Sequence, residues 1–205
     1  MSDGCCSPEQ HVAQQKNVLM IVLIINSVMF LVQASMGILA RSTSLLADST
    51  DMLADAIAYA ISLYAAGRGG RWLAKAALIK GIIITSFGII VLLEASYKMI
   101  FGSGVPYVEI MAIFSGLGLV ANTTCFYLLT RHREANINMH SAWICARNDM
   151  IANCSVLIAA GLVALTHSRW PDIIIGLMLV CVLLYSGTKV IKSALRQLSK
   201  VLTIK

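Results

Sequence analysis

Long apolar stretches are the feature of this sequence that most limits its fold. Several are long enough for the about 20 residues that a helix needs to cross the hydrocarbon core of a bilayer. They cover residues 17–40, 42–66, 72–101, 107–130, 138–166 and 172–194. Of the 205 residues only 13% are charged and 58% are hydrophobic, whereas about 25% of a soluble domain is charged. The sequence therefore predicts an all-α membrane protein with six transmembrane helices.

Little of the chain remains outside these stretches. We expect an N-terminal tail over residues 1–16, a six-helix transmembrane domain over 17–195 and a basic tail over 196–205. The sequence contains no Gly-rich loop followed by Lys and Ser or Thr, which is the usual phosphate-binding motif of nucleotide enzymes. We therefore expect no nucleotide, no bound cofactor and no enzymatic activity.

The positions of the basic residues predict the orientation in the membrane, because Lys and Arg accumulate in cytoplasmic loops. The ends and connections that would share one side carry Lys16, Arg68, Arg71, Lys75, Arg131, Arg133, Lys192, Arg196, Lys200 and Lys205. The opposite connections carry Arg41, Lys98 and Arg169 nearby. Both termini are therefore expected in the cytoplasm. This topology also explains the net charge of +6 without a nucleic-acid partner, and the basic tail is expected to contact anionic lipid.

The second stretch carries three aspartates, in the segment "LLADSTDMLADA". Each costs about 2.5 to 3.5 kcal/mol at the centre of a spanning helix on insertion scales, so they are not expected to face lipid. At 100° per residue Asp48, Asp51 and Asp55 share one face of the helix. A hydrogen-bonded interior cluster is one interpretation. Three carboxylates on one stripe favour a functional site instead.

A second polar row occurs in the fifth stretch, where Cys145, Asp149 and Asn153 follow one another at a spacing of four residues. With both termini on one side, the second and fifth stretches run antiparallel. This arrangement places Cys145 at the same depth as Asp55, Asp149 at the depth of Asp51, and Asn153 at the depth of Asp48. Four oxygen and sulfur donors around one point suit a tetrahedral divalent ion such as zinc. A cysteine in a helix can equally be a small buried apolar residue.

Several motifs follow one another in the order found in a known family. They are "NVLMIVLIINSVMFLVQASMGILARSTSLLADSTDMLADA", "EASYKMIFGSGVP", "GLGLVANTTCFYLL", "NMHSAWICARNDMIANCSVLIAA" and "WPDIIIGLMLVCVLLYSG". Over the whole chain the sequence resembles the cation diffusion facilitators, six-helix exporters of divalent metal driven by proton exchange. The resemblance implies a metal/proton antiporter that works by alternating access as a homodimer. Its cargo would be a zinc- or cadmium-class ion, with mercury or lead as softer candidates.

The resemblance also implies the metal ligands, Asp51, Asp55, Cys145 and Asp149. The family usually has His in the fifth span, four residues before the aspartate, where this chain has Cys145. Because thiolate is softer than imidazole, we expect a shift in preference toward softer ions. Asp48 and Asn153 are candidate accessory residues, with Asp48 as an exit or proton-relay group.

The family's C-terminal cytoplasmic domain has no counterpart after the sixth stretch, so the sequence indicates a short form. This favours, as an alternative, a metal-binding regulatory or partner subunit of a larger exporter. Cys5 and Cys6 are expected either to hand a thiophilic ion to the pore or to belong to an inert tail. Arg147 faces away from the proposed site and is expected to pair with a group such as Glu94 or with a second protomer. The expected location is a bacterial inner membrane.

Overall fold

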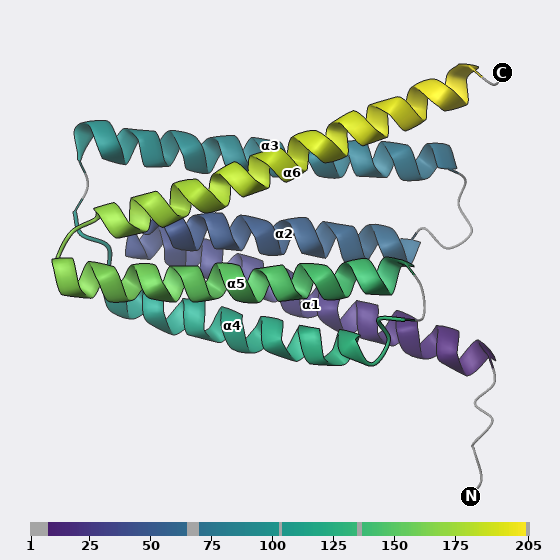
Figure 1. Ribbon diagram of the computed structural model, residues 1–205, viewed down its shortest axis with the longest axis horizontal. Helices are drawn as coiled ribbons and strands as arrows, with labels where there is room; N and C mark the ends of the chain where they lie inside the picture. Colours follow the sequence, from purple (N-terminus) through teal and green to yellow (C-terminus); the bar gives the residue numbers. More distant parts are fainter. Residues whose placement is uncertain (1–7, 65–69, 103, 135–136, 204–205) are drawn as a thin grey trace, which may run out of the picture.

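Six helices follow one another in the computed structural model, which describes residues 8–64, 70–102, 104–134 and 137–203 (Figure 1). They are α1 (Pro8–Ala40), α2 (Thr43–Tyr64), α3 (Gly70–Phe101), α4 (Val108–Thr130), α5 (Ile137–Thr166) and α6 (Trp170–Thr203). Each helix overlaps one of the six apolar stretches. The prediction of an all-α protein with six long helices is confirmed.

Five of the helices have the length and apolar composition to cross a membrane, and α2 differs from them in carrying the three aspartates. At 1.5 Å per residue a helix of 22 residues is about 33 Å long, enough to cross the hydrocarbon core. Large apolar side chains such as Leu31, Leu93 and Leu165 are more than 60% exposed on the outer surface. In a bilayer this surface faces lipid. The first and last described residues lie at the same end of the bundle (Figure 1).

The terminal helices extend beyond the predicted spans. Helix α6 continues to Thr203, through most of the segment predicted as a tail, and α1 begins at Pro8. The segment "LRQLSK" after Ala194 contains no Gly or Pro and is rich in good helix formers, so nothing ends the helix where the apolar stretch ends. Figure 1 shows the C-terminal part of α6 projecting past the end of the neighbouring α3.

The helices form two groups. Helices α1, α2, α4 and α5 pack together, whereas α3 and α6 form a pair of their own beside α2, in which α6 runs diagonally across the view (Figure 1). Helix α2 contacts α1, α3, α5 and α6. This central position explains why so much of the polar first half of α2 is buried. The three aspartates are therefore held away from the lipid-facing surface.

The turn between α1 and α2 is only two residues long. Arg41 adopts a left-handed backbone conformation with φ of 53°, and the Ser42 N–H donates to the Gly37 carbonyl at 3.0 Å. The Arg41 N–H donates to the Ile38 carbonyl at 3.1 Å, which completes a Schellman motif with Arg in the usual Gly position. Ser42 then acts as the N-cap of α2, because its hydroxyl accepts the Leu45 N–H at 3.1 Å.

Helix α6 approaches the beginning of α2 very closely. The Ser42 hydroxyl donates to the Asp172 carboxylate at 2.7 Å. Gly176, one turn further along α6, has no side chain to separate the backbones: a Cβ there would lie 2.7 Å from the Thr43 methyl group and 2.9 Å from the Ser44 nitrogen. The start of α2 is thereby fixed against α6, on the end of the bundle away from the termini.

Helix α3 is tied to the same corner. Glu94 and Lys98 form an ion pair one turn apart, the Thr43 hydroxyl donates to Glu94 at 2.9 Å, and the Lys98 ammonium donates to the Arg41 carbonyl at 2.9 Å. The partners of Glu94 are thus on α2 and α3.

The expectation that Glu94 could pair with Arg147 was wrong, because Glu94 is engaged by Lys98 and Thr43 near the end of α3. Arg147 lies on the exposed face of α5, where its guanidinium carbon is 5.8 Å from the centre of the Trp143 ring. This distance is compatible with a cation–π contact.

Candidate metal centre

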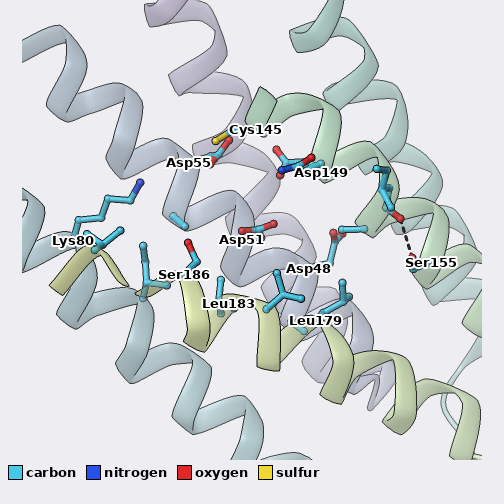
Figure 2. Close-up of a pocket in the computed structure, with 18 residues that line it drawn as sticks. Asp48, Asp51, Asp55, Lys80, Cys145, Asp149, Ser155, Leu179, Leu183 and Ser186 are labelled. Atoms are coloured by element: carbon cyan, nitrogen blue, oxygen red, sulfur yellow. Dashed lines mark hydrogen bonds between the residues drawn. The ribbon is translucent and has the colours of Figure 1, made fainter. Parts of the chain in front are cut away.

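The acidic face of α2 lines a cavity of about 390 Å³ between α2, α3, α5 and α6 (Figure 2). Asp48, Asp51 and Asp55 all border it, as their shared helical face predicts. Asp48 and Asp55 are only 2% and 5% exposed. Carboxylates this deeply buried in a membrane domain need charged, hydrogen-bonding or metal partners.

Helix α5 supplies donors from the opposite wall. Cys145 and Asp149 border the same cavity, and Asp149 is 4% exposed. The carboxyl groups of Asp51 and Asp149 are close enough to interact directly, and Asp55 interacts with both Cys145 and Asp149. The antiparallel packing of α2 and α5 therefore brings together the four residues singled out in the sequence (Figure 2).

Two further residues were missed in the sequence, one bonded to a candidate ligand and one in the lining of the cavity. The Tyr59 hydroxyl, one turn after Asp55 on α2, donates to the Asp55 carboxylate at 2.7 Å. Lys80 on α3 borders the cavity beside Asp55 and Cys145. Both had a detectable signal: Tyr59 follows Asp55 at a spacing of four, and Lys80 is a charged residue well inside an apolar stretch.

A buried amide pair lies next to the acidic row. The Gln33 side-chain nitrogen on α1 is 3.4 Å from the Asn153 side-chain oxygen, and also donates to the Phe114 carbonyl at 3.1 Å. Gln33 is in addition a neighbour of Asp48. Asp48 thus borders the cavity, whereas the amide of Asn153 points toward α1 and α4. The two are linked through Gln33, a third polar residue that the sequence analysis did not single out.

Gly118 on α4 makes room for this pair. A Cβ at that position would collide with both the Asn153 oxygen and the Gln33 nitrogen. The Ser115 hydroxyl, on the same helix, donates to the Asn153 carbonyl at 2.9 Å. The amide cluster therefore depends on a missing side chain in α4.

The donor set of the cavity is chemically suited to a divalent metal ion. Three carboxylates and one thiol offer the oxygen and sulfur ligands that zinc-class ions accept. Among the side chains that the structure describes, no three His, Cys, Asp or Glu groups already converge on a single point. Contact of one ion with all four donors therefore requires side-chain rotation, for which the cavity provides space. Cys5 and Cys6, the other candidate thiols, lie outside the described residues.

Comparison with known protein families assigns the chain. A family model described as the cation efflux transmembrane domain matches residues 19–199. The protein belongs to the cation efflux family. A search of curated proteins gave no match. The matched range contains every residue that lines the cavity, so the cavity belongs to the transmembrane domain that defines the cation efflux proteins.

Membership of the cation efflux family defines the general activity. The protein is a multi-pass membrane transporter of metal cations and not an enzyme. The metal ion is its cargo. A buried acidic cavity among α2, α3, α5 and α6 is a location at which such a cargo can lose its hydration shell and be held by carboxylates.

Proposed function

We propose that this cation efflux protein exports zinc- or cadmium-class divalent ions in exchange for protons, with Asp51, Asp55, Cys145 and Asp149 as the metal ligands. The proposal rests chiefly on one observation. Carboxylates of α2 meet a carboxylate and a thiol of α5 in a single buried cavity of about 390 Å³. Such a concentration of acidic groups is expensive in a membrane and is typical of an ion pathway.

Proton exchange follows from the chemistry of the ligands. Carboxylates and thiols bind metal only in their deprotonated forms, so binding a cation releases protons and protonation expels the cation. In an alternating-access cycle the cavity would bind the ion from the cytoplasm, open to the other side, and release the ion as protons return. Inward movement of protons would then drive export.

Two neighbouring residues would assist this cycle. Tyr59 donates to one oxygen of Asp55 at 2.7 Å, which orients that carboxylate toward the cavity. Asp48 stands one turn from Asp51, nearer the end of α2 that is opposite the termini. We assign it an exit or proton-relay role, with Asn153 supporting it through Gln33.

The thiol sets the expected range of cargo. Thiolate ligands favour soft ions, and zinc also accepts them readily, so cadmium and zinc are the principal candidates, followed by mercury and lead. We further propose that the transporter works as a homodimer in a bacterial inner membrane with both termini in the cytoplasm. The excess of Lys and Arg in the tails and connections that would lie on the cytoplasmic side supports the orientation.

The decisive experiment is a flux assay on the purified full chain in proteoliposomes, with Zn²⁺ and Cd²⁺ tested separately, with and without a pH gradient. We expect metal movement that a proton gradient accelerates and that Asp51→Ala, Asp55→Ala or Asp149→Ala abolishes. Glu109→Ala, which removes an exposed carboxylate at the start of α4, is the matched control and should transport normally. Wild-type flux from any of the three cavity variants would contradict the ligand assignment.

A binding protein that moves no metal is the competing function, namely a regulatory or partner subunit of a larger exporter. This function predicts that the purified chain binds Zn²⁺ and that Asp55→Ala abolishes the binding. It also predicts that liposomes containing only this chain show no metal flux. The same preparation therefore separates the two functions.

A further inference from the structure

Lys80 is a charged residue of the cavity that the ligand set leaves unexplained. It lies on α3, whereas the four proposed ligands lie on α2 and α5. Its side chain is half-buried, and Figure 2 shows it extending along the cavity with the ammonium group directed toward Asp55 and Cys145. A lysine near the middle of a bilayer normally reaches for an interface or for a fixed negative charge.

The positive charge of Lys80 interacts electrostatically with three of the proposed ligands, Asp51, Asp55 and Cys145. Such interactions are stronger in a partly buried site than in water, because the effective dielectric constant there is lower. A tethered ammonium therefore relieves part of the repulsion among the carboxylates when no other cation is present.

The same charge opposes a divalent ion once that ion arrives. Both cations are attracted to the same carboxylates, and they repel each other across one cavity. We infer that Lys80 is a resident cation that competes with the transported metal for Asp51 and Asp55, so that it weakens metal binding and speeds metal release. The inference rests on the proposed function, since it concerns the same ligands.

The helix that carries Lys80 gives the competition a structural basis. Helix α3 packs mainly on α6 and less extensively on α2. Lys80 and the donors it faces therefore belong to different helices. Any displacement of the α3–α6 pair would change the distance between the ammonium and the ligands, and with it the strength of the competition.

The test is equilibrium binding of Zn²⁺ alone to the purified full chain in lipid nanodiscs, at one pH and one ionic strength, by competition with a chromophoric chelator. Lys80→Met removes the charge at similar length and should bind Zn²⁺ at least about tenfold more tightly, since tenfold corresponds to only 1.4 kcal/mol. Release into excess chelator, followed by stopped flow, should slow correspondingly. Lys80→Arg keeps the charge and should resemble the wild type.

Lys75→Met is the matched control, because Lys75 is an exposed lysine of the same helix outside the cavity lining. It should leave both affinity and release unchanged. If Lys80→Met does not yield folded protein, Lys80→Gln serves in its place. Binding by the neutral variants that equals or is weaker than that of the wild type would overturn the inference, since a purely structural lysine would give that result.

Asp55→Ala separates this inference from the proposed function. If the wild type and Asp55→Ala bind Zn²⁺ equally, the proposed site is wrong whatever Lys80 does. If Asp55→Ala loses binding while Lys80→Met matches the wild type, the site stands and only the role given to Lys80 is refuted.

Discussion

Asp172 on α6 accepts the backbone N–H of Thr43, the first residue of α2, at 2.7 Å. The same carboxylate also accepts the Ser44 N–H at 3.0 Å and the Ser44 hydroxyl at 2.6 Å. Its charge therefore occupies the positive end of the α2 helix dipole and satisfies two backbone donors that the helix cannot satisfy itself. Helix α2 carries the acidic row, so this cap fixes the element on which the cavity depends.

The first prediction follows from that cap. Asp172→Ala leaves buried N–H groups without an acceptor, and we expect it to lower the free energy of unfolding by about 2 kcal/mol. Denaturation of the purified protein in detergent measures this. Glu109→Ala, at an exposed position in the first turn of α4, should change stability by less than about 0.5 kcal/mol. Equal effects of the two substitutions would show that the Asp172 cap is unimportant.

The sequence predicted those features of the fold that depend on local residue patterns. The length of each apolar stretch located the helices, since about 20 continuous apolar residues suit a spanning helix, whereas a spanning strand needs only about 10. The spacing of four residues placed Asp51 with Asp55 and Cys145 with Asp149 on common faces, and antiparallel packing aligned the two rows. These relations need only helix geometry and the direction of each span.

The missed features depend on how helices rotate against each other. Lys80 borders the cavity only because α3 packs on α2 in one particular orientation, which no spacing within α3 reveals. The cap of α2 by Asp172 joins residues about 130 positions apart. Helix α6 also continues past its apolar stretch to Thr203, because polarity and helix propensity are separate properties and the last turns are polar but strongly helical.

The second prediction concerns Gly118, whose missing side chain accommodates the Gln33–Asn153 amide pair. Gly118→Ala should displace one of these buried amides and destabilise the protein by about 1 to 3 kcal/mol. Transport should fall with it, because Asn153 is on the helix that carries Asp149. Gly116→Ala is the matched control, since a Cβ there would meet nothing within 4 Å. Thermal unfolding and flux of both variants test the difference, and a harmless Gly118→Ala would refute it.

The third prediction separates Asp48 from the proposed ligands. Asp48→Asn keeps the size of the side chain and its hydrogen-bonding capacity toward Gln33, but removes the charge one turn from Asp51. A relay or exit residue should then slow flux by at least about tenfold, equivalent to roughly 1.4 kcal/mol in the barrier. Zn²⁺ affinity should stay within about threefold of the wild type, or roughly 0.7 kcal/mol. A loss of binding as large as that of Asp51→Ala would make Asp48 a ligand.

The fourth prediction tests the thiol. Cys145→His exchanges a soft sulfur for a nitrogen at the same position of α5, while Asp51, Asp55 and Asp149 remain. Because thiolate contributes more to soft ions than to zinc, the variant should keep zinc transport and lose preference for cadmium. Cys145→Ser should weaken transport of both ions, since a hydroxyl is a poor ligand at neutral pH.

A competition flux assay with Zn²⁺ against Cd²⁺ measures this, run at a single pH because deprotonation of the ligands is coupled to binding. Cys154→Ala is the control, because Cys154 is an exposed cysteine of the same helix and its removal should leave the ratio unchanged. We expect the zinc-to-cadmium ratio to rise at least about tenfold in Cys145→His, a difference of 1.4 kcal/mol between the two ions. An unchanged ratio in Cys145→His and Cys145→Ser would mean that the thiol only packs against the cavity. The fourth donor would then have to be water or Asp48, which borders the same cavity.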